Sequence, residues 1–134
     1  MKKYIADTNF YLRFILQDNK EQAQLTKKRL QQAKKGEIKI LFADEVILEM
    51  EFVLRSVYSV DRKDITEDLL KLIKNDFVEI ENRYLWMVSL GIYRDVKIDL
   101  LDIYLSVKAN ESGYEVLSYD KDFRKLERIL KNKN

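Results

Sequence analysis

The sequence predicts an α/β fold of three layers, in which helices cover both faces of a mainly parallel central sheet of four or five strands. Single short strands alternate with helical stretches, so each connection crosses over the sheet and neighbouring strands run parallel. The 134 residues contain no linker, repeat or low-complexity tract. This length is typical of one domain, which we take as residues 1–134.

The first half of the chain begins with a strand and a capped helix. We expect a strand at 3–6, a turn and cap at Asp7-Thr8-Asn9, a helix to about residue 16, a polar surface helix at 20–35 and a buried strand at 38–42. Gly36 stands where a helix ending favours glycine. A helix capped by Asp44 then runs to about residue 58. Its apolar stripe consists of Val46, Met50, Val53 and Val57.

The second half contains four expected helices and two expected strands. The helices lie at 64–75, 83–93, 100–112 and 121–130, and the strands at 77–80 and 115–119. Gly113 is expected to end the third of these helices. Parallel sheets place their sites outside the carboxyl ends of the strands. Attention therefore falls on Asp7 and Asp120, which follow the first and last strands.

Composition restricts the chemistry. The chain has no His and no Cys, which excludes Ser-His-Asp and Cys-His nucleophiles, zinc fingers, haem ligation and disulfides. Catalysis must come from carboxylates, amines, hydroxyls or a bound hard metal. The 25 Lys and Arg against 23 Asp and Glu give a net charge of +2, which by itself favours neither nucleic acid nor membrane.

The sequence contains no membrane span or signal peptide that we can identify. Its uncharged apolar runs are far shorter than the ~20 residues of a transmembrane helix. The first acid, Asp7, precedes any signal-peptide core. We therefore expect a cytoplasmic protein without membrane contact.

Four acidic residues form the candidate catalytic set. Asp7 and Asp120 each follow a strand, where a helix cap and a catalytic carboxylate are compatible interpretations, and Asp122 is an alternative cap. Glu49 borders the apolar stripe, where a charge is costly unless it is paired or metal-bound, although its stem can pack while its head reaches water. Asp102 follows Asp99 by three residues, so both acids lie at the start of one predicted helix. Such a pair can complement the helix dipole, or it can form a hard-cation site.

Convergence of these carboxylates would require a cation. Close acids repel one another and raise each other's pKa, and bound Mg²⁺ or Mn²⁺ offsets the repulsion through the oxygen ligands these ions prefer. Metal-activated water can then attack a phosphodiester without any histidine. The predicted catalytic and metal-binding residues are Asp7, Glu49, Asp102 and Asp120.

The segments around these acids resemble the four acidic motifs of PIN-domain nucleases, and the chain length resembles that of VapC-type toxins. The resemblance implies cleavage of single-stranded RNA that leaves a 5′-phosphate and a 3′-hydroxyl. It implies that Asp7 and Asp102 are the main metal ligands, with Glu49 and Asp120 completing the site. The supporting residues it implies are Asn9, Asp99 and Ser118, the last in place of a common Thr. It also implies a VapB-like antitoxin and a homodimer.

An RNA substrate requires phosphate contacts. Six positive charges fall in the last fourteen residues, and a second basic run is Lys27-Lys28-Arg29 with Lys34-Lys35. Solvated helix faces are the alternative interpretation. The candidate RNA-binding residues are Arg13, Arg55, Lys121 and Arg124. Two alternative functions remain open, a catalytically silent PIN-fold RNA-binding or scaffold module and an aspartate-based phosphotransfer domain.

Overall fold

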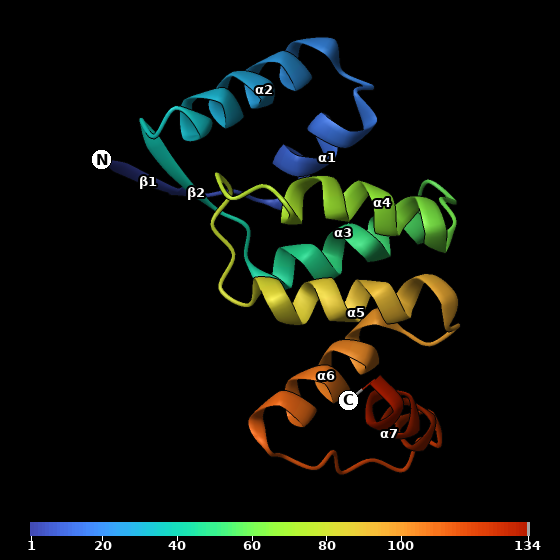
Figure 1. Ribbon diagram of the computed structural model, residues 1–134. Helices are drawn as coiled ribbons and strands as arrows, with labels where there is room; N and C mark the ends of the chain where they lie inside the picture. Colours follow the sequence, from blue (N-terminus) through green and yellow to red (C-terminus); the bar gives the residue numbers. More distant parts are fainter. Residues whose placement is uncertain (134) are drawn as a thin grey trace. The chain divides into compact units, whose positions relative to one another are not determined.

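A computed structural model describes residues 1–133 of the chain (Figure 1). Asn134, the last residue of the domain predicted at 1–134, lies outside the described residues. The chain divides into two compact units, and the boundary falls between Arg83 and Tyr84.

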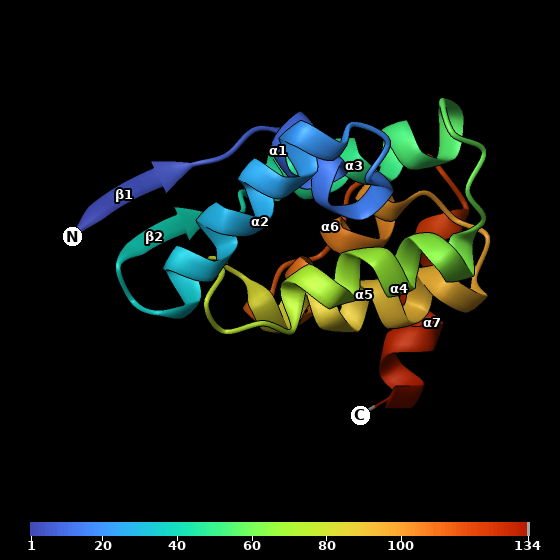
Figure 2. The same ribbon diagram turned by 90° about the horizontal axis from the view of Figure 1, so that it is seen from above.

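The first unit is built on two parallel strands. Its elements are β1 (Lys2–Ile5), α1 (Thr8–Leu16), α2 (Lys20–Lys34), β2 (Ile38–Leu41), α3 (Asp44–Ser56) and α4 (Arg62–Ile73). β1 and β2 lie side by side (Figure 2), in a register that runs from Lys2 opposite Ile38 to Ile5 opposite Leu41. The pairing is parallel because the connection between the strands contains α1 and α2, as a crossover requires. This part of the predicted sheet is confirmed.

Helix α1 is fixed to the end of β2 by one aromatic side chain. Tyr11 is fully buried, and its hydroxyl donates a hydrogen bond of 3.1 Å to the carbonyl of Leu41. Its ring lies 4.1 Å, centroid to centroid, from the ring of Phe42. Burial raises the pKa of Tyr11, so the hydroxyl stays protonated and remains a donor. The residues that follow β1 are thereby held at the carboxyl edge of the strand pair.

The strand predicted at 77–80 is reduced to a single bridge. The Glu79 carbonyl accepts a 2.8 Å hydrogen bond from the amide of Phe42, the residue after β2. The Glu79 amide donates a 2.9 Å hydrogen bond to the carbonyl of Ile40 in β2. The Arg83 guanidinium donates to the carbonyls of Ile73, Asn75 and Val78. These bonds hold the connection after α4 as a turn and leave few residues extended.

The buried face of α3 differs from the predicted stripe. Fully buried positions are Ile47, Met50 and Leu54, whereas Val57 is exposed. The helix is rotated by about one residue, or 100°, from the orientation that the valines indicate. Asp44 is also not the cap, because Ala43 occupies that position. The Asp44 carboxylate instead accepts a 3.2 Å hydrogen bond from the Asn82 side chain.

The second unit consists of helices. α5 (Arg83–Asp95) starts at the boundary, and α6 (Leu100–Ser112) and α7 (Asp122–Lys133) follow. Trp86 of α5 is fully buried and stacks on Tyr104 of α6, with ring centroids 3.8 Å apart and planes 7° from parallel. Gly113 ends α6 with a φ of 76°, the left-handed conformation that its predicted role requires.

The segment predicted as the last strand, 115–119, pairs with no strand among residues 1–133. Leu117 and Tyr119 are fully exposed. The Ser118 hydroxyl accepts a 3.0 Å hydrogen bond from the Asp120 amide, which turns the chain into α7. The described sheet therefore has two strands, and the prediction of four or five is not confirmed. None of the described helices has the length and apolar character needed to cross a membrane.

Candidate acidic site

Asp7 lies where the sequence places it, between β1 and α1. Its Oδ1 accepts a 3.0 Å hydrogen bond from the Phe10 amide and so caps α1. The side chain is exposed, and within residues 1–133 its second oxygen has no hydrogen-bond partner. One oxygen of Asp7 therefore serves the fold while the other faces solvent, so the two interpretations of this residue are compatible.

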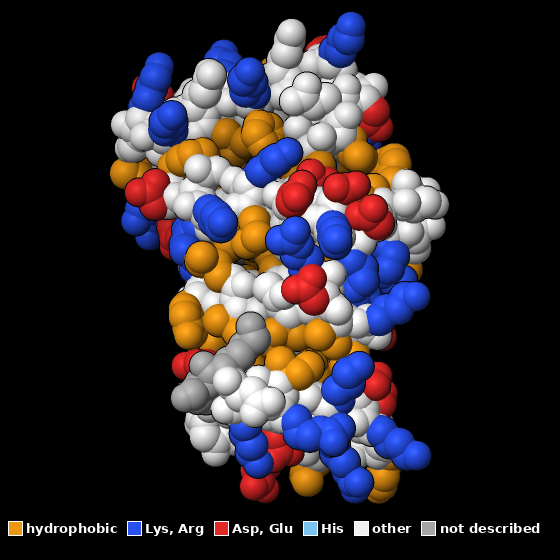
Figure 3. Space-filling model, turned by 45° about the vertical axis from the view of Figure 1, so that its right-hand side comes forward, with side chains coloured by type: hydrophobic (Ala, Val, Ile, Leu, Met, Phe, Trp, Pro, Cys, Tyr) orange, Lys and Arg blue, Asp and Glu red, His pale blue; other side chains and the backbone are white. Residues whose placement is uncertain are grey.

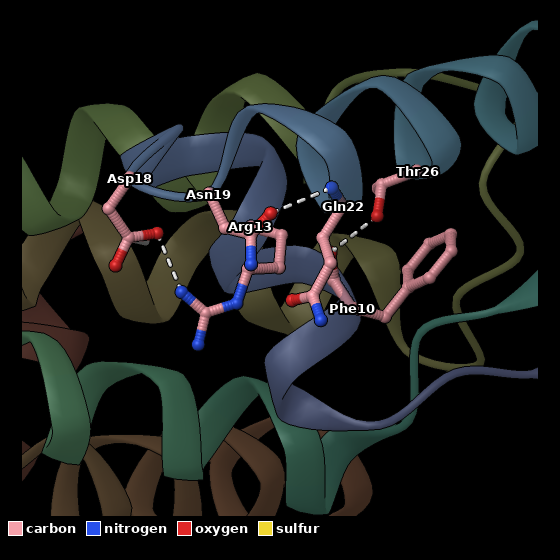
Figure 4. A network of polar contacts seen from close by, with 6 residues as sticks. All are labelled: Phe10, Arg13, Asp18, Asn19, Gln22 and Thr26. Carbon is pink, nitrogen blue, oxygen red and sulfur yellow. Dashed lines mark hydrogen bonds and ion pairs between the residues drawn. The ribbon is translucent and has the colours of Figure 1, made fainter.

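Arg13 lies two turns further along α1 and is held in place. Its Nη1 donates to Asp18 Oδ1 at 2.6 Å (Figure 4). Asn9 lies exposed on the first turn of the same helix. Because Asp18 already neutralises much of the Arg13 charge, this arginine is a weaker phosphate contact than the sequence indicates.

Glu49 is exposed on α3, so the cost of burying a charge there does not arise. The acid that this helix does bury is Glu51, which is 6% exposed. Its Oε2 accepts a 2.7 Å hydrogen bond from Arg55 Nε, one turn away. Arg55, predicted to contact RNA, therefore neutralises a buried carboxylate. The i, i+4 spacing of Glu51 and Arg55 was the sequence signal that could have identified the pair.

Asp102 lies half-buried on the first turn of α6, in the second unit. Burial raises the pKa of its carboxyl, and the negative charges of Asp99, Asp120 and Asp122 raise it further. Asp99 is the N-cap residue of the same helix. Residues twenty positions apart in the sequence thus act on one carboxylate, as expected if the third and fourth acidic segments share a site.

Asp120 and Ser118 form the turn before α7. Asp120 Oδ1 accepts a 2.9 Å hydrogen bond from the Asp122 amide, so Asp120 bonds the first backbone amide of the helix. Beside them lies a cavity of about 600 Å³ whose walls include Asp120 and the exposed cations Lys121 and Arg124. Ser106 also lines it, and its buried hydroxyl has no hydrogen-bond partner among the described residues.

The structure brings together part of the predicted set. In the second unit the charges of Asp99 and Asp120 act on the carboxylate of Asp102, whereas Asp7 and Glu49 belong to the first unit. Among residues 1–133, no three acidic side chains are arranged to hold a metal ion. The donors are nevertheless all carboxylate oxygens, and mutual repulsion at Asp102 is what a hard divalent cation relieves. The chemistry of the donor set fits Mg²⁺ or Mn²⁺.

A groove that the sequence did not predict lies between α1 and α2 in the first unit. We call it the α1–α2 groove, and its volume is about 540 Å³. Asp7, Asn9 and Arg13 line it from α1 and its cap. The α2 wall includes Gln22, Leu25, Lys28, Arg29 and Gln32. Thr26 joins the walls, since its hydroxyl donates to the Phe10 carbonyl at 3.2 Å (Figure 4).

Comparison with known proteins assigns this crossover unit, with acids after its strands and on its helices, to a family. The chain matches the PIN domain model over residues 4–129 and belongs to that family. It is 27% identical to the VapC ribonuclease of Aquifex aeolicus (strain VF5) over 123 residues. This matched region covers 91% of this chain and 90% of that protein. The predicted resemblance to PIN-domain proteins of the VapC type is confirmed. No solved structure matches the chain.

The raised pKa of Asp102 predicts how its removal affects stability. A pKa raised by folding means that the ionised carboxylate destabilises the native state above that pKa, and the penalty disappears below the ordinary carboxyl pKa. Asp102→Asn should raise the free energy of unfolding at pH 7, without metal, by up to about 1 kcal/mol. Urea denaturation of both proteins from pH 7 to pH 3.5 measures the difference, which should shrink as the pH falls.

Glu111→Gln is the matched control, because it removes an exposed carboxylate from the same helix. It should change the free energy of unfolding by less than about 0.5 kcal/mol at either pH. A loss of stability in Asp102→Asn at pH 7 would contradict the repulsion that we describe.

Proposed function

We propose that the protein is a metal-dependent endoribonuclease that cleaves single-stranded RNA. The observation that carries the proposal is the effect of Asp99, Asp120 and Asp122 on the half-buried carboxylate of Asp102. Carboxylates gathered at this cost to folding indicate a functional site. Membership of the PIN domain family and similarity to a protein named a VapC ribonuclease support the same activity.

The proposed roles follow the acidic segments. Asp7 and Asp102 would be the main ligands of Mg²⁺ or Mn²⁺, with Glu49 and Asp120 completing the set directly or through water. When bound, the ion supplies activation of water and stabilisation of the leaving oxygen. Asp7 is oriented by its bond to the Phe10 amide, and Asp120 by its bond to the Asp122 amide. Asn9, Asp99 and Ser118 are proposed as supporting polar groups.

The substrate contacts are proposed from the accessible cations. Lys121 and Arg124 are exposed beside Asp120 and are suited to the phosphates of RNA. Arg13 can contribute a weaker contact. Arg55 is assigned to Glu51 instead. Cleavage by metal-activated water would leave a 5′-phosphate and a 3′-hydroxyl.

The purified protein should cleave unstructured RNA with Mg²⁺ or Mn²⁺ and lose that activity in EDTA. Asp7→Asn and Asp102→Asn should each lower the cleavage rate by at least about 100-fold, because each removes a charged ligand. Cleavage of a labelled oligoribonucleotide, resolved on a denaturing gel with analysis of both new ends, measures the effect.

Two control variants separate chemistry from folding. Asn caps helices about as well as Asp, so Asp7→Asn should keep α1 intact. Asp61 caps α4 in the same way, by accepting a 2.9 Å bond from the Asp64 amide. Asp61→Asn and Glu111→Gln should therefore cleave as the parent protein does. Full cleavage in EDTA would refute the metal mechanism.

We propose that the two units form one domain with a sheet of four or five strands. The family match at 4–129 spans both units and supports this. Ile5 of β1 is 69% exposed, and Leu117 of the segment 115–119 is fully exposed, although both are apolar residues with high or moderate strand tendency. Addition of 115–119 to the sheet would remove such side chains from water.

Hydrogen exchange tests the additional strand. If 115–119 pairs in the sheet, the amides of Val116 to Tyr119 should exchange at least about 100-fold more slowly than in an unfolded peptide. Exchange of 116–119 at the unfolded rate would exclude the strand.

We propose that this nuclease is the cytoplasmic toxin of a toxin–antitoxin pair, acts as a homodimer and is neutralised by a VapB-like antitoxin. The name of the Aquifex aeolicus relative supports this role. Exposed apolar side chains on α3, Phe52 at its outer face and Val57 at its end, are available for a protein partner.

Induced expression tests the toxin role in cells. The wild-type protein should arrest growth, and Asp7→Asn should not, because arrest requires RNA cleavage. Asp61→Asn should arrest growth as the wild type does, since it alters only a different helix cap. Arrest by Asp7→Asn at equal protein levels would support one of the two alternatives, a catalytically silent RNA-binding or scaffold module.

A further inference from the structure

The α1–α2 groove has apolar lining residues, which we call its floor, and polar ones, which we call its rim. Phe10, half-buried, and Leu25, which is 58% exposed, provide the apolar surface. Its volume of about 540 Å³ falls within the range of pockets that bind small molecules. An exposed leucine in a groove gains stability when a flat apolar group covers it. The floor is therefore suited to one face of an aromatic ring.

The rim of the groove is cationic. Lys28 is exposed and forms no ion pair within residues 1–133. Arg29 donates from Nη1 to Gln32 Oε1 at 3.2 Å, and its guanidinium lies 5.2 Å from the centre of the Tyr4 ring. These contacts orient Arg29 without neutralising it. α2 as a whole carries four lysines, one arginine and one glutamate, and several blue side chains project from the upper part of the molecule in Figure 3.

Amide side chains add neutral donors and acceptors between the two helices. The Gln22 side chain extends from α2 toward α1 and ends near Arg13 (Figure 4). Its backbone amide is bonded to Asn19 Oδ1 at 3.0 Å, which fixes the start of α2. Gln32 lies further along the same wall. Amides of this kind form hydrogen bonds with the edges of unpaired bases.

The groove also includes Asp7, the acid at its α1 wall. A chain that occupies the groove therefore lies against the carboxylate assigned to the proposed catalytic site. We propose that the α1–α2 groove binds a nucleotide of single-stranded RNA, with its phosphate at Lys28 and Arg29 and its base over Leu25 and Phe10, and so positions the strand at Asp7. This inference rests on the proposed function and assigns it a substrate subsite.

An acidic peptide is the other polyanion that such a rim attracts. The observations favour RNA, because a peptide carboxylate uses the cations alone. A nucleotide also uses the apolar floor and the neutral amides of Gln22 and Gln32. The two occupants differ in what they require of the groove, and an experiment with both probes distinguishes them.

The test compares two adjacent lysines of α2. Lys28 lines the groove, whereas Lys27 is equally exposed and does not. Binding of a fluorescein-labelled ten-nucleotide oligouridylate is measured by anisotropy in EDTA, so that cleavage does not interfere. Lys28→Gln should weaken binding about five-fold and lower the slope of log K against log salt by about 0.7, the loss of one phosphate contact on a single strand. Lys27→Gln should change neither quantity.

The outcomes separate this inference from the nuclease proposal. With Mg²⁺, Lys28→Gln should raise KM and leave kcat unchanged, because it alters binding and none of the acids. If the wild-type protein binds RNA as described but never cleaves it, the nuclease proposal fails and the groove assignment stands. Equal weakening by Lys27→Gln, or no weakening by Lys28→Gln, overturns the assignment. The assignment would also be overturned if Lys28→Gln weakened the binding of a labelled oligoglutamate peptide but not that of the oligouridylate.

Discussion

β1 and β2 pair in parallel, and the position of Asp7 depends on that pairing. The register that sets Ile5 opposite Leu41 fixes where β1 ends, and the Tyr11 hydroxyl then ties α1 to the Leu41 carbonyl. The turn between them has little freedom, since Asp7 bonds the Phe10 amide at the same time. A carboxylate in this position gains its orientation from the backbone, which explains how an exposed acid can keep one orientation.

The fold compensates the charges of Glu51 and Asp102 in different ways, and the difference separates a structural acid from the one proposed to be functional. Glu51 is buried beside the guanidinium of Arg55, so its charge is compensated within one turn of helix. Asp102 is half-buried among other acids, and its charge is opposed by its surroundings. A protein gains nothing in stability from the second arrangement. Such an uncompensated group is therefore the better indicator of a bound cation.

Local signals in the sequence predicted most helices and both paired strands. Asp7 as cap of α1, and Gly113 as the end of α6, depend on short-range bonds and were predictable. The buried face of α3 was not, because apolar residues occur on more than one side of this helix and the ion pair with Arg55 allows Glu51 to be buried. The exposure of Glu49 follows from that same rotation. Strand pairing at 77–80 and 115–119 depends on distant residues, which periodicity does not report.

A net charge of +2 conceals a separation of charge along the chain. Cations are concentrated on α2. Acids are concentrated at the start of α6 and in the turn before α7. In the α1–α2 groove the two signs meet, since Lys28 and Arg29 share its walls with Asp7. A polyanion drawn to the cations is repelled by Asp7 and by any carboxylate near it. Binding in the groove can thus proceed without a metal, whereas close approach of a phosphate to the acids requires a cation between them.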